Sequence, residues 1–308
     1  MNRLGVKVLE TSTITNAIQV YFKLTKPRVW WLLVFVGVAG FLAGSSQPLE
    51  PTTLLTTVVG LISGSAGAES LANYIERDID AKMERTRRRP LPMGLIKPPE
   101  KALILGLTLI AFSLIISALL LNIPAFLAML LGIIDYVLIY IVLTKRRTAW
   151  NIILGSPAGA APVFVGYAAA SGTIDATALT LGLLVVLWIP SHIWSLALRY
   201  REDYIRAGIP MLPTVLPERA AVRVLAGTSL LLVTSSLILP FLSEKFFRPA
   251  YMAVAALLGA IMVALSLRVL RKPDQRSAWI LFKFTSPYLA LLFSAVLAES
   301  LLVLLHAH

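Results

Sequence analysis

Long apolar runs alternate with short polar segments along almost the whole chain. Each run holds roughly 20 residues with few charges, the length that an α-helix needs to cross the hydrocarbon core of a bilayer. The pattern predicts an all-α membrane protein, a bundle of about nine transmembrane helices. The first run is short and the fifth is rich in Gly, Ala and Pro, so we expect both to be closely packed interior helices. The predicted spans are 29–45, 54–72, 102–121, 124–143, 150–170, 177–198, 220–240, 249–268 and 279–304.

The composition agrees with this pattern and limits the function classes. Hydrophobic residues make up 57% of the chain and charged residues 14%, with a mean hydropathy of +0.80. The net charge of +12 would suggest nucleic-acid binding in a soluble protein. Here the basic residues lie in short loops between spans, so we expect no nucleic-acid partner. The spans leave no room for a second soluble domain, which predicts a single transmembrane domain over 1–308.

The distribution of Lys and Arg predicts the orientation of the chain. Of the 28 basic residues, 26 lie in the segment 1–28 or in alternate loops, a bias typical of the cytoplasmic side. We therefore expect a multi-pass protein of the cell membrane with a cytoplasmic N-terminus and an external C-terminus. Two cytoplasmic loops, 73–101 and 199–219, are too long and too patterned to be mere connectors.

The first long loop carries an acidic and then a basic cluster. If the second helix continues to residue 84, Asn73, Glu76 and Asp80 share one face, and Asp78 lies on the opposite face. Carboxylate and amide oxygens suit Mg²⁺, which substrate phosphates and waters usually complete. The run Arg85–Arg89 can neutralise the same phosphates. The alternative is a solvated juxtamembrane helix with internal ion pairs, but acidic residues add little to topology and need another reason to share a face.

Other candidate binding residues lie at the ends of spans. Lys26 and Arg28 precede the first span, where they face a cavity or anchor the helix at the headgroups. Lys145 and Arg146 are candidate diphosphate partners, although they would look the same as topology signals. Asn151 lies inside an apolar helix, where an amide is costly without a partner.

The second long loop follows a span that contains a histidine. His192, Arg199 and Asp203 share a face if this helix is continuous, because they are spaced by seven and then four residues. The imidazole of His192 either packs through a hydrogen bond or contacts an acceptor substrate. We expect Pro190 and residues 208–213 to break the helix and let the loop fold over a cavity.

These segments resemble the UbiA superfamily of intramembrane aromatic prenyltransferases, and within it the protohaem IX farnesyltransferase branch. The most specific match is Asp203-Tyr204 through Pro213, beside Arg-Asp-Ile-Asp-x-Lys-Met-x-Arg-Thr-x-x-Arg-Pro over 77–90. Lys-Pro-Arg at 26–28 and Lys-Arg-Arg-Thr at 145–148 extend the resemblance along most of the chain. The chain departs from the superfamily in placing Ala72 where Asn is usual, with Asn73 one residue later, and in having Glu76 where Asp is usual.

The resemblance implies a Mg²⁺-dependent enzyme at the cytoplasmic face. It would transfer a farnesyl group from farnesyl diphosphate, or a longer prenyl diphosphate, to a vinyl group of haem B to give haem O. A haem A synthase or a terminal oxidase assembly factor would be a partner. The catalytic candidates are Glu76, Asp80, Arg85 and Asp203, and the metal ligands Asn73, Glu76, Asp80 and Asp203. The substrate-binding candidates are Lys26, Arg28, Asn73, Arg89, Lys145, Arg146, Asn151, His192, Arg199 and Tyr204.

Two alternatives remain open. A relative within the superfamily would prenylate a quinone precursor, a chlorin or a glycerol-phosphate lipid instead of haem. A membrane transporter would carry inward charges at mid-membrane depth. In this chain the charges gather at one face, and Asp135 is expected to be the main ionisable residue in a helix interior. This distribution favours the enzyme.

Overall fold

A computed structural model describes residues 16–46, 50–242 and 249–306 as a bundle of helices. These ranges contain no strand, and nine of their helical segments are long and apolar enough to cross a membrane. The predicted fold class is therefore confirmed, while the first 15 residues of the expected cytoplasmic segment lie outside the description. The elements are residues 16–24, α2 (Pro27–Gly44), α3 (Pro51–Ile75), α4 (Arg77–Lys82), α5 (Glu100–Leu120), α6 (Ile123–Ile134) continued by the π-helix η1 (Asp135–Thr144), α7 (Asn151–Ser171), α8 (Ala176–Arg199), α9 (Arg201–Arg206), α10 (Leu212–Val215), α11 (Glu218–Leu242), α12 (Pro249–Arg271) and α13 (Gln275–His306).

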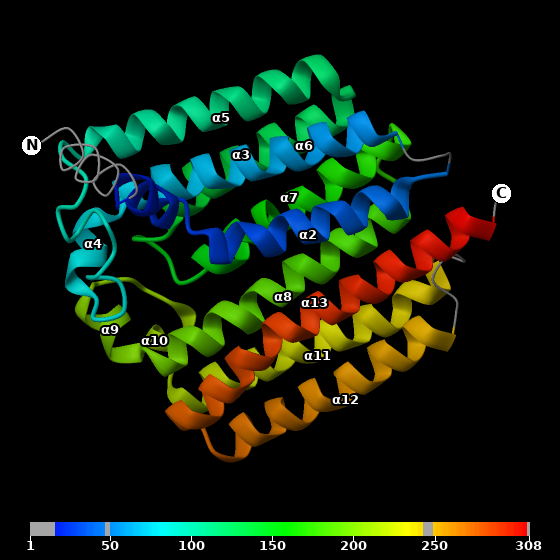
Figure 1. The fold of residues 1–308 in the computed structure, drawn as a ribbon. Coiled ribbons are helices and arrows are strands. Elements are labelled where there is room, and N and C mark those ends of the chain that lie inside the picture. Colours follow the sequence, from blue (N-terminus) through cyan, green and yellow to red (C-terminus); the bar gives the residue numbers. More distant parts are fainter. Residues whose placement is uncertain (1–15, 47–49, 243–248, 307–308) are drawn as a thin grey trace, which may run out of the picture.

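The short helices α4, α9 and α10 lie together at one end of the bundle, where α2 also begins, and α13 ends at the opposite end (Figure 1). Both long charged loops therefore meet at one end of the molecule. The backbone N–H of Arg85 in the first loop donates to Asp203 in the second at 3.1 Å. Residues more than a hundred positions apart are thus in direct contact.

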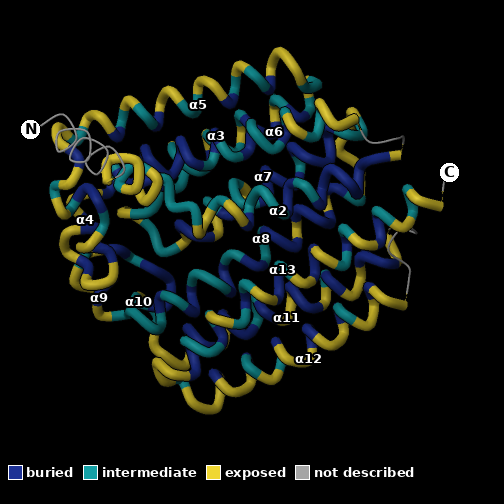
Figure 2. The backbone as a smooth tube through the Cα atoms, in the orientation of Figure 1, coloured by how far each residue is buried: buried dark blue, intermediate teal, exposed yellow. Residues whose placement is uncertain are grey.

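Burial follows the arrangement expected for a bilayer. The outermost helices, α5 and α12, carry exposed residues along their length, whereas buried positions dominate α2, α7 and α8 (Figure 2). The exposed residues of α5 include Leu107, Ile115 and Leu119. Apolar side chains on the outer face match a surrounding lipid, which provides no reason to hide them.

Small residues bring α2 and α7 into close contact, as predicted for the first and fifth spans. A Cβ added at Gly166 would lie 1.9 Å from the carbonyl oxygen of Gly37, and one added at Gly40 would lie 2.6 Å from that of Val163. Neither position has room for a side chain. Close backbone approach through small residues is typical of helix pairs in membranes.

Two helices lack the continuity on which the predicted shared faces depend, and one expectation about a helix break is wrong. The second span ends at Ile75, because Glu76 leaves helical geometry at φ −96° and ψ 5°. The chain restarts as α4, which stops at Lys82 before reaching Glu84, because Met83 is extended at φ −94° and ψ 129°. The sixth span ends at Arg199 and not beyond it, since Tyr200 has φ −113° and ψ 34°. Pro190, by contrast, does not break α8, where it is an interior residue. Transmembrane helices tolerate proline because neighbouring groups compensate the lost bond.

Candidate functional site

A cavity of about 690 Å³ opens among α2, α3, α4, α6, η1, α7, α8 and α13. Most of its charged lining lies at the loop end of the bundle, and its deeper lining is mainly apolar, with Val36, Leu61, Met129 and Val165 among the wall residues. Of the described residues, five basic and three acidic side chains line it. They are Lys26, Arg28, Arg85, Arg89 and Lys145, with Glu69, Glu76 and Asp80.

Asp80 is held by a bidentate contact from Arg89. The Nη1 atom of Arg89 donates to both carboxylate oxygens, at 2.8 and 2.7 Å, and Asp80 is buried. Burial alone would lower the pKa of Arg89, but the charge of Asp80 raises it above its usual value. Asn73 is buried nearby without lining the cavity: its Nδ2 donates to the Leu24 carbonyl at 2.6 Å and its Oδ1 accepts from Arg89 at 3.5 Å. The charge of Asp80 is thus already neutralised by Arg89 at the cavity wall.

Glu76 forms a second buried ion pair, with Lys145 from the start of the 145–150 loop. Burial alone would lower the pKa of Lys145, but the carboxylate of Glu76 raises it above the ordinary value. The ammonium also lies 5.1 Å from the centre of the Tyr140 ring. Glu76 and Asp80 therefore face the same cavity, as predicted, although the helix between them and Asn73 is interrupted.

Asp203 connects the two loops. It is buried and accepts the backbone N–H of Arg85 at 3.1 Å, but it is not part of the cavity wall. The guanidinium of Arg85 does line the cavity, with its Nη2 3.5 Å from the hydroxyl of Tyr204 and its Cζ 5.8 Å from the Tyr200 ring centre. Asp203 therefore fixes the backbone of a residue whose side chain faces the cavity.

Besides Asn73 and Asp203, three further predicted residues lie outside the cavity wall. Arg146 pairs with Asp78 at 2.8 Å, and this contact lowers the pKa of the Asp78 carboxyl. Arg199 donates to the side chain of Gln275. Asn151 is fully buried and donates to the carbonyls of Thr148 and Pro210 at 2.6 and 3.1 Å, which ties α7 to the second loop. In this geometry none of these three side chains is placed to contact a substrate in the cavity.

His192 is part of an aromatic wall. Its ring is stacked between Trp188 and Phe282, with centroid distances of 4.6 and 4.5 Å, and Trp279 stacks on Phe282 in turn at 5.1 Å. Its Nδ1 lies 2.6 Å from the hydroxyl of Thr285. All four rings line the cavity. The wall offers a flat surface to a planar or unsaturated molecule.

One buried carboxylate of the cavity was not among the predicted site residues. Glu69 lies inside α3, lines the cavity and is paired with Lys26 at 2.6 Å and with the hydroxyl of Tyr136 at 2.8 Å. Asp135 is therefore not the main ionisable residue of a helix interior; it accepts the N–H of Ala158 at 2.8 Å and lies outside the cavity wall. The available signal was an acidic residue seven positions before Glu76 in an otherwise uncharged run.

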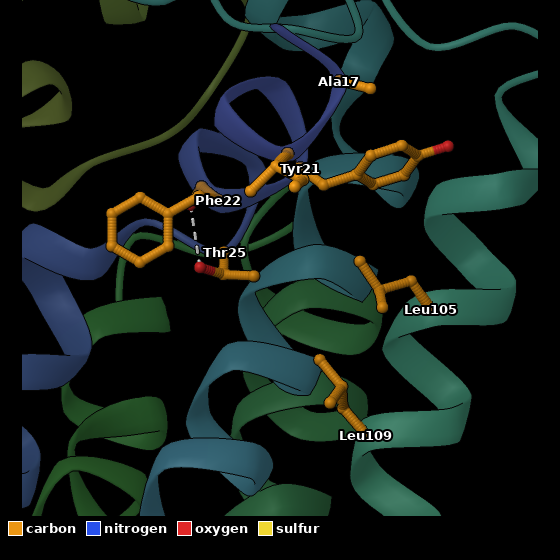
Figure 3. A pocket seen from close by; sticks show the side chains of 7 residues that line it. Ala17, Tyr21, Phe22, Thr25, Leu105 and Leu109 are labelled. Carbon is orange, nitrogen blue, oxygen red and sulfur yellow. Dashed lines mark hydrogen bonds between the residues drawn. The ribbon is translucent and has the colours of Figure 1, made fainter. Parts of the chain in front are cut away.

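A second hollow lies away from this chemistry. It is an open groove of about 430 Å³ between residues 17–25 and α5, shown in Figure 3. Its walls are almost entirely apolar, from residues such as Phe22, Leu105 and Leu109, and none of its described lining residues carries a charge. Such a groove cannot bind a phosphate group.

The sequence as a whole shows which family the chain belongs to. The model of the UbiA prenyltransferase family matches residues 32–295. The chain belongs to the UbiA prenyltransferase family. It is 42% identical over 287 residues to the protoheme IX farnesyltransferase of Thermoplasma volcanium, covering 92% of this chain and 98% of that protein. It is 41% identical over 280 residues to the protein of that name from Desulforudis audaxviator, covering 91% and 87%.

Solved structures support the UbiA fold. A digeranylgeranylglyceryl phosphate synthase superposes with a TM-score of 0.75 and 18% identity, covering 92% of this chain and 98% of the other. A UbiA homologue from Archaeoglobus fulgidus bound to GPP and Mg²⁺ superposes with a TM-score of 0.66 and 16% identity, covering 90% and 99%. At these identities the likeness establishes the fold, and with the family match it confirms the expected prenyltransferase architecture.

Proposed function

We propose that this chain transfers the farnesyl group of farnesyl diphosphate to a vinyl group of haem B, giving haem O. The choice of acceptor depends on one observation, the identity of 41–42% over nine-tenths of the chain to proteins named protoheme IX farnesyltransferase. The cavity supports the class of reaction independently, because it joins a charged end to an apolar slot of a size typical for small-molecule ligands.

At the charged end, the residues suit a metal-bound diphosphate. Glu76 and Asp80 supply only oxygen donors, which fit Mg²⁺, and no group of three His, Cys, Asp or Glu among the described residues forms a complete metal site. This agrees with Mg²⁺ sites in which one or two carboxylates are completed by waters and substrate phosphates. When bound there, Mg²⁺ would neutralise charge on the departing diphosphate. The predicted roles of Asn73 and Asp203 as metal ligands also belong to this proposal, and they would require oxygens that now accept from Arg89 and from the backbone N–H of Arg85 to turn to the metal.

Prenyl transfer begins with loss of the leaving group, and its barrier is the separation of charge. Arg85, Arg89 and Lys145 are positioned around the same end of the cavity and would stabilise the diphosphate as it leaves. Diphosphate entry would compete for the basic partners of Glu76 and Asp80 and so free these carboxylates to hold the metal. The apolar walls beyond would keep water from the allylic cation.

The aromatic wall supplies a place for the acceptor. We place the haem against His192, Trp188 and Phe282, where its planar ring can stack. The predicted contact of His192 with haem is part of this proposal. Substitution of His192 by Ala should weaken haem binding, followed by absorbance titration, while leaving farnesyl diphosphate affinity close to that of the wild type.

We also propose that the charged end faces the cytoplasm of a cell membrane. The concentration of Lys and Arg in the loops at this end supports that orientation. Because the chain has no cysteine, Glu84→Cys and Thr173→Cys would each carry a single thiol, at opposite ends of the bundle. An impermeant maleimide should label Thr173→Cys and not Glu84→Cys in intact cells; the reverse pattern would contradict the orientation.

The hydrophobic product suits transfer within the bilayer to a haem A synthase or an oxidase assembly factor, which co-purification would test.

The proposed activity can be tested on purified protein with haem B, farnesyl diphosphate and Mg²⁺. The expected product is a more hydrophobic haem on chromatography, lost on chelation of the metal. Asp80→Ala and Asp203→Ala should abolish it. Asp78→Ala is the matched control, because Asp78 lies in the same loop but is exposed, and its carboxylate pairs with Arg146 and not with a residue that lines the cavity. Full activity of both Asp80→Ala and Asp203→Ala would remove the site assignment. Prenylation of an aromatic acid or glycerol phosphate with haem unchanged would refute the acceptor.

A further inference from the structure

Glu69 is a buried carboxylate to which the proposed mechanism gives no role. It lies inside α3, seven residues before Glu76, which follows the end of this helix. Seven residues correspond to about 10 Å along the helix axis, and both carboxylates line the cavity. Its Oε2 accepts from Lys26 at 2.6 Å and its Oε1 from the Tyr136 hydroxyl at 2.8 Å. A carboxylate at this position in a membrane helix is costly, and the usual reason for one is functional.

A bond between α2 and α3 is the simplest structural explanation, but it leaves two features unexplained. Glu69, Lys26 and Tyr136 all line the cavity, although a structural pair would be as effective in the packed interface between helices. Among the described residues, each oxygen of Glu69 accepts from one donor, whereas a carboxylate offers about four acceptor sites. Glu69 can therefore accept a further hydrogen bond from a molecule in the cavity while its orientation stays fixed.

The proposed function creates a demand for such an acceptor, and the inference depends on that function. The π electrons of the vinyl group form the new carbon–carbon bond to the prenyl group as diphosphate leaves with the electron pair of the broken C–O bond. The positive charge then lies on the vinyl carbon next to the porphyrin ring. It ends in one of two ways: water adds through its oxygen and the resulting oxonium loses a proton, giving an alcohol, or a neighbouring C–H loses its proton, giving an alkene.

These two outcomes differ in what they require of the protein. Loss of a C–H proton needs only a nearby base, and the released diphosphate is one. Addition of water needs a water molecule held in an otherwise apolar cavity, with a group that accepts its proton. The oxonium is a strong acid, so a carboxylate can accept the proton even while it is paired with Lys26. Glu69 lies below the diphosphate end of the cavity, at the depth where the reacting carbons would lie.

We propose that Glu69, held by Lys26 and Tyr136, positions the water that adds to the porphyrin-side cation and accepts the proton that this water releases. Glu69 thereby selects the alcohol over the alkene. Lys26 and Tyr136 are positioning residues, because they act by fixing the carboxylate.

The experiment measures the ratio of alcohol to alkene among prenylated haems by mass spectrometry, in ¹⁸O-labelled water. The wild type should give mainly the alcohol, with the label in its hydroxyl group. Glu69→Gln should lower the alcohol-to-alkene ratio by about tenfold or more, which corresponds to about 1.4 kcal/mol between the two outcomes. Tyr136→Phe should lower the ratio by a smaller factor. Glu69→Asp, which keeps a carboxylate, should give a ratio between those of the wild type and Glu69→Gln.

The matched control is Asp135→Asn, which also removes a buried charge from a transmembrane helix but lies outside the cavity wall. Its ratio should equal that of the wild type. If Glu69→Gln does not fold, Tyr136→Phe and Glu69→Asp decide the matter through the same ratio. An unchanged ratio in the Glu69 and Tyr136 variants, at any rate of turnover, or an alkene as the wild-type product would overturn this inference alone. A wild type that does not prenylate haem at all would overturn the proposed function and this inference with it.

Discussion

The close approach of α2 and α7 gives a quantitative prediction for Gly166→Ala. A Cβ at this position would lie 1.9 Å from the carbonyl oxygen of Gly37 and 2.9 Å from the backbone nitrogen of Phe41. Both obstacles are backbone atoms, so no side chain can turn away to make room. To restore a contact of about 3 Å the two helices must separate by about 1 Å, against packing that is already dense.

The magnitude follows from two opposing effects. Overpacking of a filled site costs about 1–3 kcal/mol, and the rigid obstacles place this case in the upper half of the range. Replacing Gly by Ala inside a helix favours the folded state by about 1 kcal/mol. We therefore expect a net destabilisation of about 1–2 kcal/mol. At about 2–4 °C per kcal/mol for chains of this order of size, the unfolding temperature should fall by several degrees.

The assay is thermal unfolding in detergent at one fixed scan rate, since unfolding of a membrane protein is often irreversible and then depends on the rate of heating. Gly227→Ala is the matched control: Gly227 lies within α11, and a Cβ there would meet no atom within 4 Å. Its unfolding temperature should rise slightly. A Gly166→Ala protein as stable as the wild type, or stabilised like the control, would refute the packing argument.

Further predictions concern neighbouring polar contacts, all measured by the same thermal assay. Lys145→Ala leaves the buried carboxylate of Glu76 unpaired and should destabilise by about 3–5 kcal/mol, whereas Arg146→Ala removes a half-exposed pair and should change stability by less than about 1 kcal/mol. Asn122→Ala removes the cap that accepts the N–H of Ala125 on α6 and should cost about 1 kcal/mol. Because Arg146 lowers the pKa of Asp78, this pair stabilises the fold above the ordinary pKa of a carboxyl and loses its effect as pH falls through the lowered value. Asp78→Asn should remove that small acid-side loss. Equal effects of Lys145→Ala and Arg146→Ala would contradict the difference in burial.

The spans could be predicted because each depends on a local property. A bilayer requires about 20 consecutive apolar residues whatever the rest of the chain does, and the observed helices overlap every predicted run. The same locality explains the errors. Whether a helix continues past Ile75 or Arg199 depends on how the loops fold against each other, and the residue pattern is compatible with either outcome.

The members of the site were largely predictable, while their partners were not. Charges crowded into two loops indicated a shared polar site, and Glu76 and Asp80 do face one cavity. The pairing of Glu76 with Lys145, or of Asp203 with the backbone of Arg85, joins segments 69 and 118 residues apart and depends on the tertiary arrangement. Glu69 was not predicted for a different reason, because one acidic residue barely changes the mean hydropathy of a long apolar run.

The helix break at Glu76 separates a structural residue of the first loop, Asn73, from the two carboxylates that face the cavity. In an unbroken helix Asn73 and the two carboxylates would form one row. In the structure Asn73 donates to the Leu24 carbonyl and accepts from Arg89, and so fixes the first loop against the helix of residues 16–24, while Glu76 and Asp80, after the break, face the cavity. The carboxylates and their basic partners therefore already line the cavity before any substrate arrives, although their pairing would change when the diphosphate enters. Such preorganisation favours stabilisation of a departing diphosphate, because the charges need little rearrangement at the moment when the bond breaks.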